Sequence, residues 1–301
     1  MRVLIAGGTG LIGAALTKSL VNDGHEVVIL SRSAGTSKGP LVSHVQWDGR
    51  TIGEWVRQVE NVDAVVNLTG ENLSSGLWTT ARKQSILNSR VDAGKVLVEA
   101  IRRAQRKPSV LVQASGVGFY GTRQSGLLTE DAPHGDDFLA NVSTEWEAST
   151  KGVEELGVRR VVIRTAVVLS SEGGALERLL LPFRLFVGGP LGSGSQWMSW
   201  IHMHDQVQAI RFLIENQSAS GAFNLSANAL TNNEFAAVAG KVMRRPSFLR
   251  VPAFALRLLL GEMSTVVLEG QRVSAQKLIQ LGFKFSFPDL EPALKDLLKK
   301  D

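Results

Sequence analysis

The sequence predicts an α/β protein in which a doubly wound parallel sheet is followed by a smaller, mainly helical C-terminal domain. Three observations indicate this class. Short apolar runs that fit buried parallel strands alternate with helical periodicity as far as residue 169. A glycine-rich turn joins the first strand to the first helix. Beyond residue 227 the pattern becomes mainly helical, interrupted at Pro252, Gly270 and Gly282.

The first strand, turn and helix occupy residues 2–13. Residues 3–6 are an apolar run, and glycines follow at positions 7, 8, 10 and 13. Free amides and the helix dipole converge on a phosphate at such a junction. We assign Gly7 to the tight turn, Gly10 to the approach of a pyrophosphate, and Gly13 to close packing of helix on strand. The stretch therefore predicts a dinucleotide site of the Rossmann type, with a plain tight turn as the alternative.

Further strands and helices follow in alternation, which favours right-handed crossovers and a sheet covered on both faces. We expect strands at 25–30, 42–47, 63–68, 110–115, 160–169 and 223–226, and helices at 92–106 and 141–155. We place a Rossmann domain at 1–227, with 170–199 contributing to a substrate lobe. Residues 228–301 form the small C-terminal substrate or lid domain, where Thr231 and Glu234 have the spacing of a capping box.

The end of the second strand predicts the coenzyme. In this fold a carboxylate about 20 residues past the glycines binds the ribose 2′-hydroxyl of NAD, whereas an arginine accommodates the 2′-phosphate of NADP. No acidic residue stands between Glu26 and Asp48. Arg32 can bind a phosphate bidentately, and Ser31 can donate a second hydrogen bond. We predict NADP(H), with a solvent-exposed loop arginine as the alternative.

Composition excludes several other functions. The net charge of +5 comes from scattered basic residues and gives no nucleic-acid footprint. The absence of cysteine excludes disulfides and Cys-ligated zinc, and no apolar run reaches the length of a membrane span. Because the first strand starts at once, we expect no signal peptide and a cytoplasmic protein. His202 and His204 lack a third placed ligand, so we predict no metal and assign Asp205 to a helix cap.

Several motifs together resemble one subgroup of proteins. They are Gly-Gly-Thr-Gly-Leu-Ile-Gly at 7–13, Asn-Leu-Thr-Gly at 67–70, Ser-Arg at 89–90 and Trp-Glu-Ala at 146–148. The subgroup is the atypical short-chain dehydrogenase/reductase set called epimerase family proteins, and the resemblance runs to about residue 298. With the junction and Arg32, it implies a cofactor-binding set: Gly7, Thr9, Gly10, Leu11, Ile12, Gly13, Ser31, Arg32, Leu68, Thr69, Gly70, Arg90 and Val168. For Arg90 a surface salt bridge is the alternative, and for Asp48 we weigh an adenine contact against a turn.

The resemblance also implies hydride transfer between a nicotinamide and a carbonyl or alcohol. Short-chain reductases use a serine and a tyrosine whose pKa is lowered by a lysine four residues on. Ser115 matches the serine, but Trp146 and Thr150 stand at the tyrosine and lysine positions. Tyr120, the only tyrosine, is a candidate replacement acid, with a wall of the pocket as its alternative role.

Two functions remain open. The first is an NADP(H)-dependent oxidoreductase or epimerase that acts on a small molecule without the usual Tyr-Lys pair. The second is a non-catalytic NADP(H)-sensing or regulatory protein that acts through a partner. The sequence does not identify the substrate, and it leaves the oligomeric state open, a homodimer included.

Overall fold

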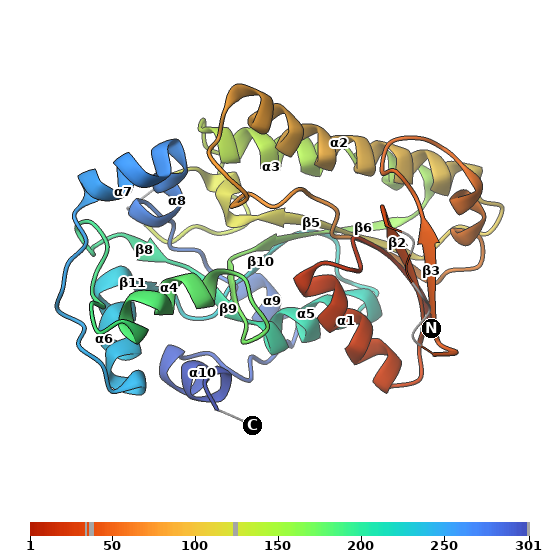
Figure 1. Ribbon diagram of the computed structural model, residues 1–301. Helices are drawn as coiled ribbons and strands as arrows, with labels where there is room; N and C mark the ends of the chain where they lie inside the picture. The colour runs from red at the N-terminus through yellow and green to blue at the C-terminus, as the bar shows by residue number, and fades with distance from the viewer. Residues whose placement is uncertain (34, 36–38, 123–125, 300–301) are drawn as a thin grey trace.

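A computed structural model describes residues 1–33, 35, 39–122 and 126–299 of the chain (Figure 1). Within this part, seven parallel strands form one sheet. Across it lie β10 (Gly221–Leu225), β6 (Arg159–Thr165), β5 (Val110–Gly116), β4 (Ala64–Asn67), β1 (Arg2–Ala6), β2 (Glu26–Ser31) and β3 (Val42–Gln46). The strand order reverses between β1 and β4, which makes this the switch point of a doubly wound sheet. The predicted fold class is confirmed.

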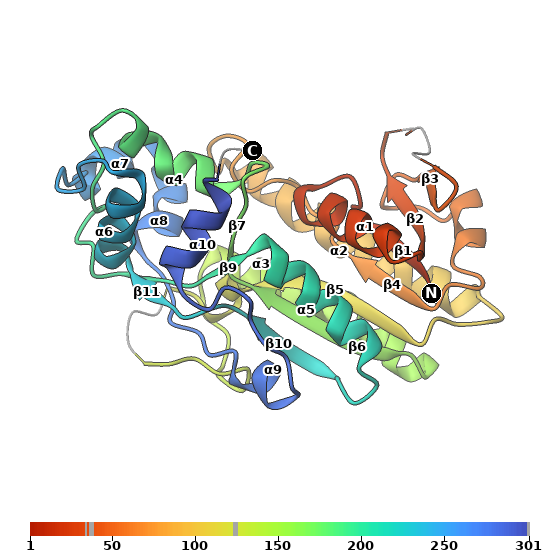
Figure 2. The same ribbon diagram turned by 90° about the horizontal axis from the view of Figure 1, so that it is seen from below.

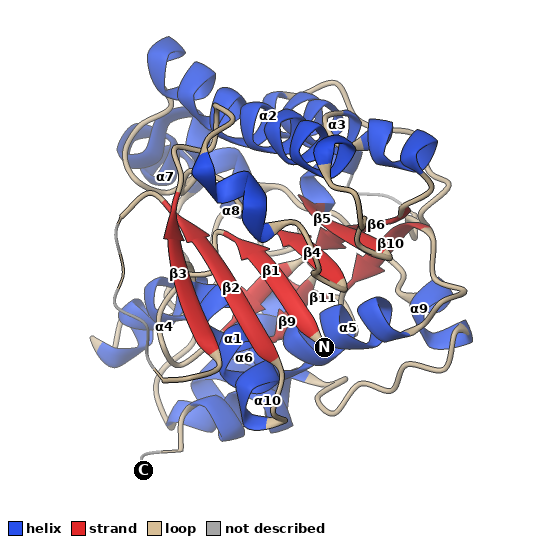
Figure 3. Ribbon diagram, turned by 90° about the vertical axis from the view of Figure 1, so that its right-hand side faces the viewer, coloured by secondary structure: helices blue, strands red, loops and turns tan. Residues whose placement is uncertain are grey.

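Helices cover both faces of the sheet, as Figure 3 shows. One layer holds α2 (Thr80–Arg103) and α3 (Phe138–Ala148), and the opposite layer holds α1 (Leu11–Asn22) and α5 (Met203–Glu215). Strand β1 explains why both layers form, because its side chains alternate between two apolar cores. Val3 and Ile5 join the core beneath α1 and α5, whereas Leu4 and Ala6 join the core beneath α2. All four are fully buried, as expected for a central parallel strand.

Three predicted elements have different bounds. Helix α2 begins at Thr80 instead of residue 92, with the Thr79 side chain accepting a hydrogen bond from the Arg82 amide. The helix predicted at 141–155 is α3 followed by a 3-10 helix, η3 (Lys151–Leu156). The strand predicted at 160–169 is interrupted at Ala166: β6 stays in the main sheet, while β7 (Val167–Leu169) pairs with β9 (Trp200–His202).

The remaining elements gather mainly at one end of the molecule, opposite β3 (Figure 2). The 3-10 helix η2 (Val117–Tyr120) follows β5, and η1 (Glu54–Gln58) follows β3. The others are α4 (Ala175–Arg184), β8 (Trp197–Met198), β11 (Leu230–Thr231), α6 (Asn232–Met243), α7 (Ala253–Leu260), η4 (Gly261–Ser264), α8 (Thr265–Leu268), α9 (Gln276–Gln280) and α10 (Leu290–Leu297). The region after residue 227 is mainly helical, as predicted, and the capping box of Thr231 and Glu234 opens α6.

The helical region shares its packing with the main sheet. Leu278 and Phe283 are buried in the core that lies between the sheet and α1 and α5. Helix α10 instead packs against α6 in a separate core, to which α4 also contributes. The boundary at 227 stays a prediction. None of the described helices combines the length and the apolar character needed to cross a membrane.

Candidate dinucleotide site and the polar network beside it

The turn after β1 depends on two glycines. Gly7 has φ of +81°, and a Cβ there would lie 2.9 Å from the Leu68 carbonyl oxygen. A Cβ on Gly13 would lie 2.5 Å from the Gly7 carbonyl oxygen, so helix α1 packs directly on the turn. These contacts agree with the tight turn and the close packing predicted from the sequence. Gly10, the N-cap of α1, has φ of −74° and lies on the exposed side of the turn.

This turn opens on a pocket of about 530 Å³ at the switch point. Of the predicted cofactor-binding residues, the pocket is lined by Gly7, Thr9, Gly10, Ser31, Arg32, Leu68, Thr69 and Gly70. The pocket is also lined by four residues that were not predicted: Trp47, Arg50, Glu71 and Ser89. Trp47, Arg50 and Glu71 lie in loops, and Ser89 lies on α2.

The N-terminus of α1 supplies the positive end of the pocket. No side chain caps this helix, and its first turn holds no acidic residue. The first amides of a helix have no carbonyl partner within it, so those of Leu11, Ile12 and Gly13 can bind an anion. Beside them, the Thr69 hydroxyl is buried with no hydrogen-bond partner in the described part of the chain. Together these groups fit a phosphate-bearing ligand.

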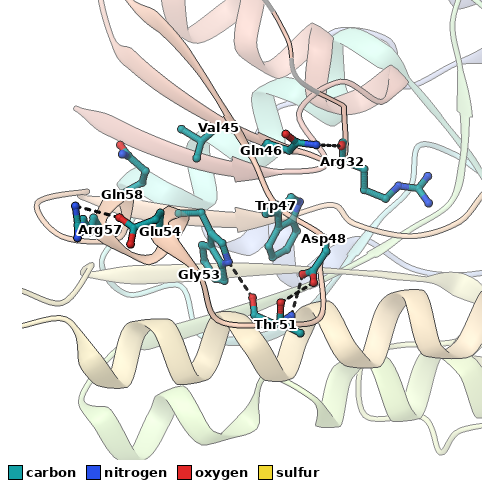
Figure 4. A pocket seen from close by; sticks show the side chains of 11 residues that line it. Arg32, Val45, Gln46, Trp47, Asp48, Thr51, Gly53, Glu54, Arg57 and Gln58 are labelled. Atoms are coloured by element: carbon teal, nitrogen blue, oxygen red, sulfur yellow. Dashed lines mark hydrogen bonds and ion pairs between the residues drawn. The ribbon is translucent and has the colours of Figure 1, made fainter.

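Arg32 lies where this pocket meets a second one of about 740 Å³, since Arg32, Trp47 and Asp48 line both (Figure 4). In Figure 4, Arg32 and Arg57 stand at opposite ends of the second pocket. Asp48 forms a turn, because its carboxylate accepts hydrogen bonds from the Arg50 and Thr51 amides. The turn interpretation of Asp48 therefore agrees with the structure.

One predicted phosphate partner, Ser31, and one further cation of the pocket, Arg50, already have polar partners. The Ser31 hydroxyl is buried and donates to the Ser33 carbonyl at 2.7 Å, so it cannot also donate to a phosphate in this arrangement. Arg50, which was not predicted, lines the same pocket and lies 3.6 Å from the Asp92 carboxylate. Arg32, the cation of the predicted pair, is exposed and lines the pocket.

Glu71 is an acidic group in the wall of the pocket, and neighbouring donors hold it. The Ser85 hydroxyl and the Arg82 guanidinium both donate to its carboxylate. The Ser85 hydrogen bond, together with Arg82 and the charge of Arg32, holds the pKa of Glu71 below its usual range. The carboxylate is therefore ionised and paired, which limits its repulsion of an anionic ligand.

Arg90 is neither exposed nor in a surface salt bridge. It lies inside α2, where its guanidinium donates to the Ile86 and Glu71 carbonyls at 3.0 Å each. Its Cζ lies 4.9 Å from the ring centroid of Trp146, and a Cβ on Gly70 would approach it to 2.9 Å. Burial lowers the pKa of Arg90 to about 10. Arg90 thus supports the loop after β4, and a direct contact with a cofactor remains a prediction.

Ser115 belongs to a polar network that sequence reasoning missed. Its hydroxyl donates to Oε1 of Glu147 at 2.7 Å. Arg164 binds the same carboxylate bidentately, from Nε at 2.9 Å and from Nη2 at 3.0 Å. The three residues come from β5, α3 and β6, so only the folded chain brings them together. Because its hydrogen points to Glu147, Ser115 offers lone pairs to any further partner.

Tyr120 does not have the predicted role of replacement acid. Its side chain is fully buried, so it is not an exposed pocket wall either. The hydroxyl donates to Asn224 at 2.7 Å and accepts from Nη1 of Arg164 at 3.1 Å. Burial raises the pKa of Tyr120, although Arg164 opposes the shift. The hydroxyl is therefore fully occupied in holding Arg164.

Two buried residues, Trp146 and Thr150, stand where the sequence resemblance predicts the tyrosine and the lysine. Trp146 is buried against Arg90, and Thr150 is fully buried with its hydroxyl 3.3 Å from Nε of Arg160. Val168, another predicted cofactor residue, lies half-buried on β7 and packs against the core beneath α1 and α5. Neither Val168 nor Arg90 lines the pocket at the turn.

The prediction that Asp205 caps α5 is wrong. His202 is the N-cap, because its Nδ1 accepts from the His204 amide at 3.0 Å. The Asp205 carboxylate is fully buried and accepts instead from the amides of Ser286 and Phe287, at 2.8 and 2.9 Å. The chain thus uses Asp205 to hold its C-terminal segment.

Comparison with known proteins agrees with this fold. The model of the NAD dependent epimerase/dehydratase family matches residues 3–226, and that of a domain of unknown function, DUF1731, matches residues 251–297. An epimerase family protein of Staphylococcus haemolyticus is 44% identical over 299 residues, which cover 98% of each chain.

Two solved structures are similar over nearly the whole chain. The human epimerase family protein SDR39U1 (isoform 2), crystallised with NADPH, is 37% identical, with a TM-score of 0.90 and 99% of both chains covered. A nucleoside-diphosphate sugar epimerase from Corynebacterium glutamicum is 31% identical, with a TM-score of 0.79; the match covers 99% of this chain and 58% of that one. This chain therefore belongs to the NAD-dependent epimerase/dehydratase family, in the group of epimerase family proteins that carry the DUF1731 domain.

Proposed function

We propose that this protein binds NADP(H) and acts as an oxidoreductase or epimerase on a hydroxyl-bearing small molecule. The observation that carries the coenzyme assignment is the pocket at the switch point, which joins the uncapped N-terminus of α1 to Arg32. The 37% identical human relative crystallised with NADPH supports the same coenzyme.

The residues of the pocket fit the parts of the coenzyme. The amides of the turn and of the first turn of α1 would hold the pyrophosphate. Arg32 would bind the 2′-phosphate, with Arg50 as a second cation in the same wall. The unpartnered Thr69 hydroxyl would contribute one more hydrogen bond. No acidic residue follows β2 until Asp48, and its carboxylate is taken up by its own turn.

The network at Ser115 lies at the end of β5, two strands from β1 in the same sheet, and it supports proton transfer. When bound, the coenzyme supplies or accepts a hydride at its nicotinamide ring. In alcohol oxidation, Ser115 accepts the proton of a substrate hydroxyl and passes its own proton to Glu147, leaving a neutral acid beside Arg164. In reduction, the same protons return to the carbonyl oxygen. This relay replaces the missing tyrosine and lysine, and it suits a substrate that alternates between alcohol and ketone.

The coenzyme assignment is tested by changing Arg32 to Asp. A lost charge-assisted contact is worth about 1.5–3 kcal/mol, so NADPH affinity should fall at least about tenfold, whereas NADH affinity should hold or rise. Isothermal titration calorimetry measures both. Arg57→Asp is the matched control, since Arg57 is highly exposed and lines only the second pocket. Equal affinity of the wild type for NADH and NADPH would contradict the assignment of Arg32.

A non-catalytic NADP(H) sensor is the second candidate. It is favoured by the burial of Trp146 and Thr150. It is also favoured by Tyr120, whose hydroxyl already donates to Asn224 and accepts from Arg164. A panel of alcohols and carbonyls, followed by absorbance of the reduced nicotinamide, separates the two. Turnover that depends on Ser115 supports the enzyme. NADPH binding without turnover on any member of the panel supports the sensor.

A further inference from the structure

One end of the molecule carries a group of apolar side chains that are largely exposed to solvent. The apolar group is Phe186, Val187, Phe248, Phe254, Leu258 and Leu259, of which Leu258 is 88% exposed and Phe248 76% exposed. Helix α7 has no buried residue at all. Isolated exposed leucines are common, but a group of this kind indicates an interaction surface.

These residues form one surface because the segments that carry them are bonded to each other. The Leu249 amide donates to the Gly188 carbonyl at 3.2 Å, and the Val251 amide donates to the Pro190 carbonyl at 2.9 Å. The turn after α4 therefore lies alongside the segment that leads into α7. On α7, Phe254 and Leu258 share one face with Arg257, as their spacing requires. In Figures 1 and 2, α4 and α7 lie at the same end of the molecule.

The charges in the segments that carry these apolar residues have a single sign. Exposed arginines stand among the apolar residues at positions 184, 244, 245, 250 and 257. No acidic residue occurs from 178 to 204 or from 235 to 261. We call the six apolar residues and these five arginines the basic–apolar face. The whole chain has 28 acidic and 33 basic residues, so the bias is local.

One of the aromatic residues, Phe186, has a strained backbone conformation. Phe186 has φ of +62°, a conformation that is unfavourable for a large side chain. It is still 55% exposed, and the Arg245 guanidinium stacks on its ring at 4.2 Å. Strain of this kind persists where the position of the side chain is used.

We propose that the basic–apolar face docks on an anionic phospholipid bilayer. Phenylalanine and leucine side chains would enter the boundary between headgroups and acyl chains, and the arginines would bind the lipid phosphates. A second copy of the chain fits poorly, because a two-fold contact through this face would bring five arginines against five. Docking of this kind needs no membrane-spanning helix.

Flotation with vesicles tests the proposal. We expect the wild type to float with phosphatidylcholine vesicles that contain phosphatidylglycerol, to stay unbound with phosphatidylcholine alone, and to be released by salt. Arg184→Glu combined with Arg257→Glu should weaken partitioning at least about tenfold. Leu258→Ser combined with Phe254→Ser should also abolish flotation, without lowering the melting temperature, because both side chains are already in water.

Two control variants lie outside the face. Arg57→Glu removes a highly exposed arginine of η1, and Ile279→Ser removes an exposed apolar residue of α9. Neither should change flotation. Equal binding to both kinds of vesicle, no binding to either, or the same loss with the control variants would overturn the proposal. So would self-association that the Phe254 and Leu258 changes abolish, or binding to an acidic amphipathic peptide without binding to vesicles.

Discussion

At the scale of single residues, Glu147 determines whether Ser115 can transfer a proton, because the Ser115 hydroxyl donates to its carboxylate. Glu147 accepts from Ser115 while Arg164 binds both of its oxygens. If the pair relays a proton, Glu147→Gln keeps the size of the side chain but removes the group that takes the proton. We expect turnover to fall by about 10²–10⁴-fold with little change in NADPH affinity. Steady-state kinetics and calorimetry measure the two effects separately.

The pH profile distinguishes this role from a structural one. The rate of alcohol oxidation should depend on pH in the wild type, and the Glu147→Gln variant should show a different profile. Glu145→Gln is the matched control, because Glu145 is exposed on the same helix. A Glu147→Gln variant that retains full turnover and the wild-type pH profile would rule out the relay.

His202 couples stability to pH. Its pKa is lowered from the ordinary 6.5 because burial disfavours the charged ring, although Asp205 and Asp296 favour the charge. Between pH 6.5 and the lowered pKa the unfolded chain binds the proton and the folded chain does not. The stability that the neutral ring contributes is therefore complete above pH 6.5 and is lost as the pH falls through that range.

Substitution of His202 by Asn tests this coupling. Asn keeps a side-chain acceptor at the N-cap of α5 but does not titrate. Urea unfolding should show that the wild type loses more stability than the variant when the pH is lowered below 6.5. His204→Asn serves as the control, since His204 is exposed. Parallel pH dependence in the wild type and the His202→Asn variant would assign the effect to other groups.

At the scale of elements, the capping box of α6 gives a prediction about stability. Thr231 accepts from the Glu234 amide, and the Glu234 side chain accepts from the Thr231 amide. Thr231→Ala should lower the free energy of unfolding by about 1 kcal/mol. Thr144→Ala removes a hydroxyl that bonds only to a carbonyl within α3, so it should change the free energy by less than about 0.5 kcal/mol. If urea titrations gave the same loss of free energy for Thr231→Ala and Thr144→Ala, the capping box would contribute no more than an ordinary helix hydroxyl.

Local patterns made some elements predictable and left others hidden. The strand–turn–helix junction is encoded within residues 2–13, so its geometry and its glycine roles follow from the sequence. The first turns of α2 carry few apolar residues, so periodicity did not show them. Tertiary burial of Ile86 stabilises this part of the helix. Glu147 joins Ser115 and Arg164 only through the pairing of β5 with β6 and the packing of α3. No spacing in the sequence encodes that meeting.

At the scale of the whole molecule, the main sheet and the C-terminal region are stabilised together. Phe283 is buried in the core of the sheet, where its ring packs against Phe212 of α5 at 5.6 Å between centroids. Phe283→Ala should cost about 3–5 kcal/mol, and the loss should appear in a single unfolding transition. Phe248→Ala is the control on an exposed ring. Two separate calorimetric transitions, with only one shifted, would show that the regions unfold independently.

The buried carboxylate of Asp205 ties the same two regions through the backbone. It accepts both the Ser286 and the Phe287 amides, and the Asp205 side chain is fully shielded from solvent. For these two amide protons to exchange with deuterium, the C-terminal segment must separate from α5. Their exchange should therefore be as slow as that of the central strand β1 and should report opening of the whole chain. An irregular segment would then be protected like the interior of a sheet.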